Sequence, residues 1–198
     1  MSRYYVEDWT NVVDIGSSTG KTIEAMAIQN EKIAKSATYV GVEVATGFKN
    51  DMEKRFKVLQ DRLPETFFEF EFTDIRNYVF HNCSLVTSIF TLQFMPPKDR
   101  EEVIHNIYEG LNHGGAFIFA EKTVADTGRF QDMFTFMFYD HKRKSFTEKD
   151  IMDKEVTLRN MLKPNTWSEL TDMLHSAGFK NVQPFWRNFL FVGAIATK

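Results

Sequence analysis

The stretch Val12–Gly20 of this chain, VVDIGSSTG, predicts a β-strand that runs into a tight loop bounded by glycines. The β-branched residues at its start favour a buried strand, and the residues that follow it, Lys21–Ala27, have a helix-like composition. A strand, a tight turn and a helix N-terminus form the first half of a nucleotide-binding βαβ unit. Gly16 and Gly20 give the loop the backbone freedom that lets a ligand approach it closely.

The spacing of these glycines excludes two common phosphate-binding loops. A Walker A loop needs four residues between its glycines, whereas three stand here, and the dinucleotide pattern G-x-G-x-x-G is also absent. Asp14, just before Gly16, instead suits a cationic ligand, because its carboxylate can accept from an ammonium group. The pattern D-x-G-x-x-x-G resembles motif I of the S-adenosylmethionine (SAM) methyltransferases. An ordinary strand-to-helix turn is the alternative.

Composition predicts one domain over residues 1–198, which is enough chain to bury a hydrophobic core. The net charge of −3 gives no electrostatic indication of a nucleic-acid partner. The single cysteine, Cys83, excludes an intrachain disulfide and fits a reducing compartment, and no metal site is indicated. Neither a signal peptide nor a membrane-spanning run is recognisable, so we expect a cytoplasmic protein without a membrane partner.

Alternating strand and helix patterns predict an α/β fold with a single doubly wound, mostly parallel sheet of Rossmann-like class. Apolar runs such as Ser84–Phe90 are typical of parallel strands buried on both faces. The end of the chain is expected to close the sheet as an antiparallel edge. The predicted strands are about 10–15, 38–44, 67–76, 84–90 and 116–120, with a final strand region at 185–196, and the predicted helices are about 20–35, 46–61, 97–111 and 167–177.

Residues 124–164 interrupt this alternation, and we predict an irregular insertion there. The stretch is rich in Phe, Lys and Asp and follows a strand at the edge of the sheet where ligands bind. Lids and substrate-selecting elements usually lie at such positions. His141, Tyr139 and Glu155 are its candidates for a general base, which is needed only if an acceptor must lose a proton. For His141, an ordinary surface histidine is the alternative.

Suitable ligand-binding side chains follow four predicted strands in succession, at the carboxyl ends where open α/β sheets bind ligands. Glu43 can accept both ribose hydroxyls of an adenosine, although a solvated loop charge is the alternative. Asp74 can accept from the adenine amine while Ile75 packs on the ring. Glu121, after the fifth strand, is equally well explained by an ion pair. The predicted cofactor-binding residues are Asp14, Gly16, Ser17, Ser18, Gly20, Glu43, Val44, Asp74, Ile75 and Phe90.

Further short motifs point to one branch of the methyltransferase superfamily. They are Asp74–Arg76, Phe90–Phe94 (FTLQF), Ile107–Asn112, Gly114–Ala116, Glu121–Lys122, Lys142–Arg143 and Ala177–Phe179. Together they resemble the bacterial carboxy-S-adenosylmethionine synthases, which combine SAM with prephenate to make carboxy-SAM for wobble-uridine modification of tRNA. The resemblance covers about residues 10–198. FTLQF is specific to that branch, whereas the glycine loop is general to the superfamily.

Three departures from that family favour SAM itself over carboxy-SAM as the ligand. The family has about fifty residues of helical cap before the first strand, whereas Met1–Asp8 alone precede it here. The asparagine that precedes FTLQF in the family is Ile89. The arginine that holds the extra carboxylate aligns with Glu155, and a carboxylate at that point repels an anion. Arg159, one helical turn away, is a weaker substitute.

The leading hypothesis is a SAM-dependent methyltransferase that acts on an unidentified acceptor. Methyl transfer is an in-line displacement in which positioning and desolvation supply most of the acceleration. The alternatives are a carboxy-SAM synthase-like enzyme and a SAM-binding module without catalysis.

Aromatic residues at the start of the chain and in the insertion also predict a homodimer through the face that a missing cap leaves bare. They are Tyr4, Tyr5, Trp9, Phe130, Phe134, Phe136 and Phe138. Large exposed apolar patches are uncommon on monomers and usually mark an interface. The alternative is that these aromatic side chains fold inward as local core.

Overall fold

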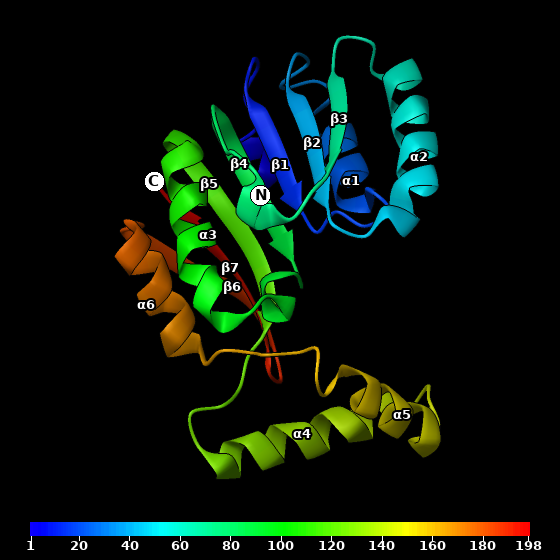
Figure 1. The fold of residues 1–198 in the computed structure, drawn as a ribbon, viewed down its shortest axis with the longest axis vertical. Coiled ribbons are helices and arrows are strands. Elements are labelled where there is room, and N and C mark those ends of the chain that lie inside the picture. The colour runs from blue at the N-terminus through cyan, green and yellow to red at the C-terminus, as the bar shows by residue number, and fades with distance from the viewer.

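A seven-stranded sheet with helices on both faces forms the body of the protein in the computed structural model, which describes residues 1–198 (Figure 1). Its order is β3-β2-β1-β4-β5-β7-β6, and only β7 runs antiparallel to its neighbours. The strands are β1 (Asn11–Ile15), β2 (Thr38–Glu43), β3 (Phe67–Phe72), β4 (Cys83–Ile89), β5 (Leu111–Lys122), β6 (Asn181–Asn188) and β7 (Phe191–Thr197). The predicted doubly wound, mostly parallel sheet with an antiparallel C-terminal edge is confirmed.

Six α-helices accompany the sheet, and the sequence explains where α6 begins and ends. Thr166 and Glu169 form a capping box at its start, and Gly178, at a φ of +118°, ends it as predicted. The helices are α1 (Lys21–Asn30), α2 (Lys49–Arg62), α3 (Pro97–Gly110), α4 (Gly128–Lys142), α5 (Glu148–Leu158) and α6 (Trp167–Ala177). None of them combines the length and the apolar character that crossing a membrane requires.

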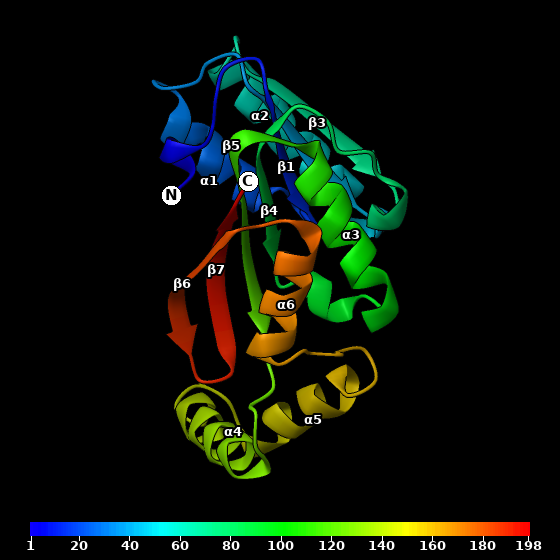
Figure 2. The same ribbon diagram turned by 90° about the vertical axis from the view of Figure 1, so that its left-hand side faces the viewer.

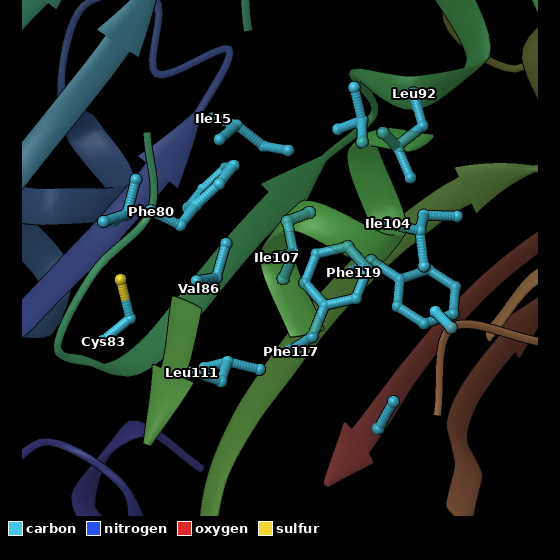
Figure 3. Packing of buried hydrophobic residues seen from close by; sticks show 14 of the residues in the cluster. Ile15, Phe80, Cys83, Val86, Leu92, Ile104, Ile107, Leu111, Phe117 and Phe119 are labelled. Atoms are coloured by element: carbon cyan, nitrogen blue, oxygen red, sulfur yellow. The ribbon is translucent and has the colours of Figure 1, made fainter. Parts of the chain in front are cut away.

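Two hydrophobic clusters, one on each face of the sheet, hold these layers together. Neighbouring strand residues point to opposite faces, so Val12 and Tyr39 belong to the cluster under α1 and α2, whereas Val13 and Val40 belong to the other. Figure 3 shows the second cluster, in which Ile104 and Ile107 of α3 lie beside the phenylalanines of β5. The continuous apolar runs of the central strands follow from this burial on both faces.

The predicted irregular insertion at 124–164 is wrong in its conformation, because these residues form α4 and α5. Phe130, Phe134 and Phe138 stand four residues apart, which places them on one helical face rather than on alternating sides of an extended chain. Thr127 caps α4 and Thr147 caps α5, each by accepting from a backbone amide. Figures 1 and 2 show both helices beyond the carboxyl ends of the strands, outside the two layers that cover the sheet.

The two ends of the α4–α5 segment lie side by side where they leave the body. Val124, before α4, and Thr166, after α5, form an isolated parallel bridge, and the Val124 amide donates to the Asn165 carbonyl at 3.0 Å. The chain therefore leaves the body and returns to it side by side.

Two further boundaries differ from the prediction. The Asn112–Gly115 stretch, expected to separate a helix from a short strand, belongs to β5. The single predicted final strand region at 185–196 is a hairpin of β6 and β7, which turns at Phe189 with a φ of +50°. Phenylalanine rarely adopts a left-handed conformation, so no local turn signal marks this hairpin.

The aromatic residues that predicted one apolar face lie in two separate places. Tyr4 and Trp9 are exposed but precede β1, at the end of the sheet opposite the carboxyl ends of the strands. The phenylalanines of α4 lie beyond those carboxyl ends (Figure 2). The expectation of a single shared face is therefore wrong.

Candidate functional site

A cleft of about 680 Å³ opens at the carboxyl ends of β1 to β4. Its volume falls within the range of small-molecule and cofactor sites. Seven of the ten predicted cofactor-binding residues line it, namely Gly16, Ser18, Glu43, Val44, Asp74, Ile75 and Phe90. The structure thus brings residues from four strand ends into one cleft, although their contacts with a ligand stay a prediction.

Glu43, at the end of β2, is almost fully buried at the edge of this cleft. Its Oε2 accepts from the Ser18 amide at 2.9 Å, and its Oε1 accepts from the Ala45 amide at 2.8 Å. These two bonds fix the carboxylate, and each oxygen keeps a free lone pair for another donor. The arrangement suits a vicinal diol, which offers two adjacent hydroxyl donors.

The backbone amides of the glycine loop donate to carbonyls of the protein itself. The amides of Gly16 and Ser17 both donate to the Val42 carbonyl, at 2.8 and 3.2 Å, and the Gly20 amide donates to Ser17 at 2.8 Å. These amides do not converge on an anion, as they do in a phosphate-binding loop. Ser17 and Gly20 do not line the cleft, so they shape the loop from behind.

Gly16 lies at the closest approach between the loop and β4. Its φ is +67°, and a Cβ built on it would stand 2.2 Å from Thr91 Oγ1. The Thr91 hydroxyl in turn donates to the Ile15 carbonyl at 3.1 Å. A side chain at position 16 would therefore push the loop and the turn after β4 apart.

Asp14 is buried beneath the loop rather than exposed in the cleft. Its Oδ1 accepts from the Thr87 hydroxyl at 2.6 Å. Burial raises the pKa of this carboxyl to about 7, against the opposing hydrogen bonds from Thr87 and Thr22, and the charge of Glu43 raises it further. The predicted contact with a ligand ammonium is thus untested, and the geometry shows Asp14 bracing β1 against β4.

Asp74 reaches the cleft but is already engaged by a neighbouring side chain. Its oxygens accept from Arg76 Nε at 3.0 Å and Nη2 at 2.6 Å, and these hydrogen bonds lower the pKa of Asp74. Arg76 also donates to Asp99 at 2.8 Å. An adenine amine would have to share the Asp74 carboxylate with this guanidinium.

Sequence reasoning missed part of the cleft wall. Phe94 and Met95 come shortly after the predicted strand that ends at Phe90, and this position is the signal that could have identified them, whereas Phe48 lies within the predicted helix 46–61. Met161 comes from the segment after α5, and no local pattern connects it to the glycine loop.

The three candidate general bases lie outside the large cleft. Tyr139 and Glu155 line a second cavity of about 120 Å³ between α4, α5 and the β6–β7 hairpin. His141 does not line it and packs against the Phe189 ring, with centroids 6.1 Å apart. An edge-to-face pair of Phe90 and Phe191, with centroids 5.8 Å apart, stands between the two cavities, since each ring lines one of them.

Glu155 is not a free anion in the second cavity. Lys142 Nζ lies 3.4 Å from its Oε1 and 4.3 Å from the centre of the Phe138 ring. Burial and the negative charge of Glu155 raise the pKa of Tyr139, while the positive charge of Arg159 opposes the shift. The like-charge argument against an anionic ligand is therefore weakened at this position, because Lys142 offsets the carboxylate.

Comparison with known proteins agrees with this architecture. Residues 13–119 match a family described as "Methyltransferase domain". The carboxy-S-adenosyl-L-methionine synthase of Staphylococcus epidermidis is 33% identical over 98% of this chain and 82% of its own length, and that of Shewanella amazonensis is 31% identical over 96% and 76%. The solved structure "PigF with SAH" has a TM-score of 0.63 at 17% identity, over 95% of this chain and 50% of that one.

The last match, at such low identity, shows the fold alone. The domain match covers the glycine loop and all four strand ends of the cleft. The two synthases extend the similarity through α4, α5 and the C-terminal hairpin. This chain belongs to the methyltransferase-domain family of SAM-dependent transferases, in the branch that it shares with the carboxy-S-adenosyl-L-methionine synthases.

Proposed function

We propose that the large cleft binds SAM, with the ribose at Glu43, adenine at Asp74 and Ile75, and the methionine end at Gly16 and Phe90. The geometry of Glu43 carries this assignment, because a buried carboxylate with two fixed oxygens suits a ribose diol. When bound, SAM supplies an electrophilic methyl carbon. The methyl acceptor is left open in this proposal.

The residues around the cleft favour transfer by positioning and by exclusion of water. The adenosine end has fixed acceptors, while Phe90, Phe94 and Met95 supply apolar walls on the side of β4. Such walls remove water from the neighbourhood of a sulfonium, and alignment supplies most of the remaining acceleration. Neither effect requires a proton to move.

A general base on this chain would act from the second cavity. Tyr139 and Glu155 line that cavity, whereas His141 lies outside it, so the first two are the better-placed candidates. The Phe90–Phe191 pair stands between them and the large cleft. A proton-bearing acceptor would therefore have to reach past this aromatic pair.

Isothermal titration calorimetry with S-adenosylhomocysteine tests the cofactor site. Glu43→Ala is expected to weaken binding tenfold or more, because a charged hydrogen bond contributes roughly 1.5–3 kcal/mol. Glu155→Ala removes the same charge outside the cleft and is the matched control, with unchanged affinity. Equal affinities for the wild type and Glu43→Ala would refute the assignment.

Carboxy-SAM synthesis is the second candidate, and the names of the two relatives favour it. We expect SAM rather than carboxy-SAM, because Glu155 stands where that family has an anion-holding arginine, and its pair with Lys142 offers no net positive charge to an extra carboxylate. Mass spectrometry of the nucleoside that co-purifies with the protein separates the two. Steady formation of carboxy-SAM from SAM and prephenate would establish the second candidate and direct attention to Lys142 and Arg159.

We propose, in addition, that a second copy of this chain covers the outer face of α4 and α5. Large apolar side chains stay exposed there, among them Phe130, Phe136, Met137, Met152 and Val156. Patches of this kind usually mark an interface. Light scattering at micromolar concentration should give the mass of a dimer for the wild type and of a monomer for Phe136→Glu. A strictly monomeric wild type would exclude this homodimer.

A further inference from the structure

The turn that follows β4 forms one wall of the large cleft and has an unusual backbone. Phe90 has a φ of +58°, which is uncommon for a residue with a Cβ, and Leu92–Phe94 continue as a short 3-10 helix. Phe90, Thr91 and Phe94 all line the cleft. A conformation of this kind persists only where the surrounding structure holds it in place.

Glu121, at the end of β5, accepts hydrogen bonds from the backbone amides of this turn. Its side chain is buried, with 2% of the residue exposed, and does not line the cleft. Its Oε1 accepts from the amides of Thr91 at 3.3 Å and Leu92 at 3.0 Å, and its Oε2 accepts from the Gln93 amide at 2.9 Å. Three converging donors require a group with acceptors only, and a carboxylate is such a group.

Arg100, from α3, donates hydrogen bonds to the backbone carbonyls of the same turn. It is buried, and its guanidinium donates to the carbonyls of Met95 at 2.7 Å and Gln93 at 3.3 Å, as well as to Asn165. The turn is therefore clamped between an anion that meets its amides and a cation that meets its carbonyls. Neither charged side chain touches the cleft itself.

The clamped turn contacts the glycine-loop end of the cleft directly. Thr91 packs against Gly16, whose missing Cβ leaves the room for it, and donates to the Ile15 carbonyl. Glu43, at the ribose end, is fixed instead by the amides of Ser18 and Ala45. A shift of the turn would thus disturb the methionine end while the ribose end keeps its own support.

We propose that Glu121 and Arg100 are positioning residues that set the turn after β4, and through it the affinity of the site for the methionine portion of SAM. This inference rests on the proposed function of the cleft. From the sequence, Glu121 is either a ligand-binding side chain or a member of an ion pair, whereas this inference makes it a support for the turn.

The test compares two probes, S-adenosylhomocysteine and adenosine, by calorimetry at pH 8. Glu121 is mostly ionised there, because pH 8 lies above its pKa, which burial raises to about 7. In Glu121→Gln an amide group would face the turn's own donors, so S-adenosylhomocysteine should bind about tenfold more weakly. Adenosine affinity should stay within about twofold. Glu109→Gln, an exposed acid on α3, is the control for the change of charge.

Arg100→Lys provides the same comparison from the other side of the turn, and carries the test if Glu121→Gln does not fold. It keeps the charge but loses donors, so it should weaken S-adenosylhomocysteine several-fold and leave adenosine unchanged. Equal losses for both probes, or no loss for either, would overturn the positioning role. A wild type that binds neither probe would instead refute the proposed function, and this inference with it.

Discussion

The large cleft and the α4–α5 segment are close in space but differ in how they are held. Around the cleft, Glu43 and Glu121 are buried and have backbone partners, and the strands that carry them are packed on both faces. In the α4–α5 segment no residue of α4 is fully buried, and Ile151 is the only buried residue of α5.

This difference in burial matches the two tasks of the proposed function, cofactor binding and acceptor choice. A site that binds one fixed cofactor benefits from rigid, preorganised groups, because ordering them at binding would reduce affinity. A segment with few buried contacts opens at lower free energy and tolerates substitution more readily. We therefore expect cofactor affinity to depend on the body and acceptor choice to depend on the α4–α5 segment.

The largest expected difference concerns buried and exposed phenylalanines. Phe117, fully buried on β5, packs between Phe119 and Phe179, whereas Phe136 on α4 is 64% exposed. In the monomer, Phe117→Ala should lower the free energy of unfolding by about 3–5 kcal/mol, and Phe136→Ala by less than about 0.5 kcal/mol. Urea unfolding measures both over a range of protein concentrations. A further, concentration-dependent loss in Phe136→Ala is expected from the proposed dimer, whereas a large loss at the lowest concentrations would contradict the comparison.

Two glycines provide the next comparison. Gly16→Ala should destabilise the protein by about 2–4 kcal/mol, because its φ is positive and its Cβ would meet Thr91. Gly128, the first residue of α4, has open space around it, so Gly128→Ala should stabilise by up to about 1 kcal/mol. Thermal unfolding decides this, and a loss of stability in Gly128→Ala would show that α4 packs more tightly than its surroundings indicate.

The buried carboxylates of the body predict a pH dependence that the exposed segment does not share. Burial raises the pKa of Asp14 from 3.8, and that of Glu121 from 4.5, to about 7, against the backbone hydrogen bonds of the turn and the charge of Arg100 in the case of Glu121. Between about pH 4 and 7 the folded state binds more protons than the unfolded state, so stability falls as the pH rises through this window.

Asp14→Asn removes one of these titrations and should make that fall shallower. Its Oδ1 can still accept from Thr87, so the fold is expected to remain intact. Chemical unfolding of both proteins at pH 5 and pH 8 measures the difference in slope. Parallel lines for the variant and the wild type would mean that Asp14 is ionised throughout the window.

The smallest expected difference is between two helix caps of the same kind. Thr147 and Thr166 each form a capping box, at the start of α5 and of α6. Thr166→Ala should lower global stability by about 1 kcal/mol, because α6 packs on the core. Thr147→Ala should instead speed amide exchange in α5 alone. Hydrogen exchange with mass spectrometry distinguishes the two, and a global effect of Thr147→Ala would mean that α5 unfolds together with the sheet.

The part of the site that could be predicted from sequence is the part with a local signal. Glu43, Asp74 and Phe90 each end a strand, and parallel strands bring their carboxyl ends to one edge, so their meeting in one cleft follows from the order of the elements. Asp14 shows the limit of that argument. Strand alternation decides whether a side chain faces the ligand or the interior, and a tight turn obscures the alternation.

The remaining features depend on contacts that are distant in sequence. The hydrogen bond from Arg76 to Asp99, and the position of Met161 in the cleft wall, follow from the packing of α3 and of the segment after α5. Phe134, Phe136 and Phe138 stand at every second position, and this spacing hides the helical period of α4. Their true period shows only when Phe130 is included.

The bridge between Val124 and Thr166 makes the α4–α5 segment a closed excursion that leaves and re-enters the body at neighbouring positions. Because the two ends lie side by side, their separation does not depend on the number of residues between them. The entropy of closing such a loop grows slowly with its length, so residues gained or lost near Lys144 or Phe146 change folding stability little. The length of the α4–α5 segment can thus change while the sheet and the large cleft keep their form.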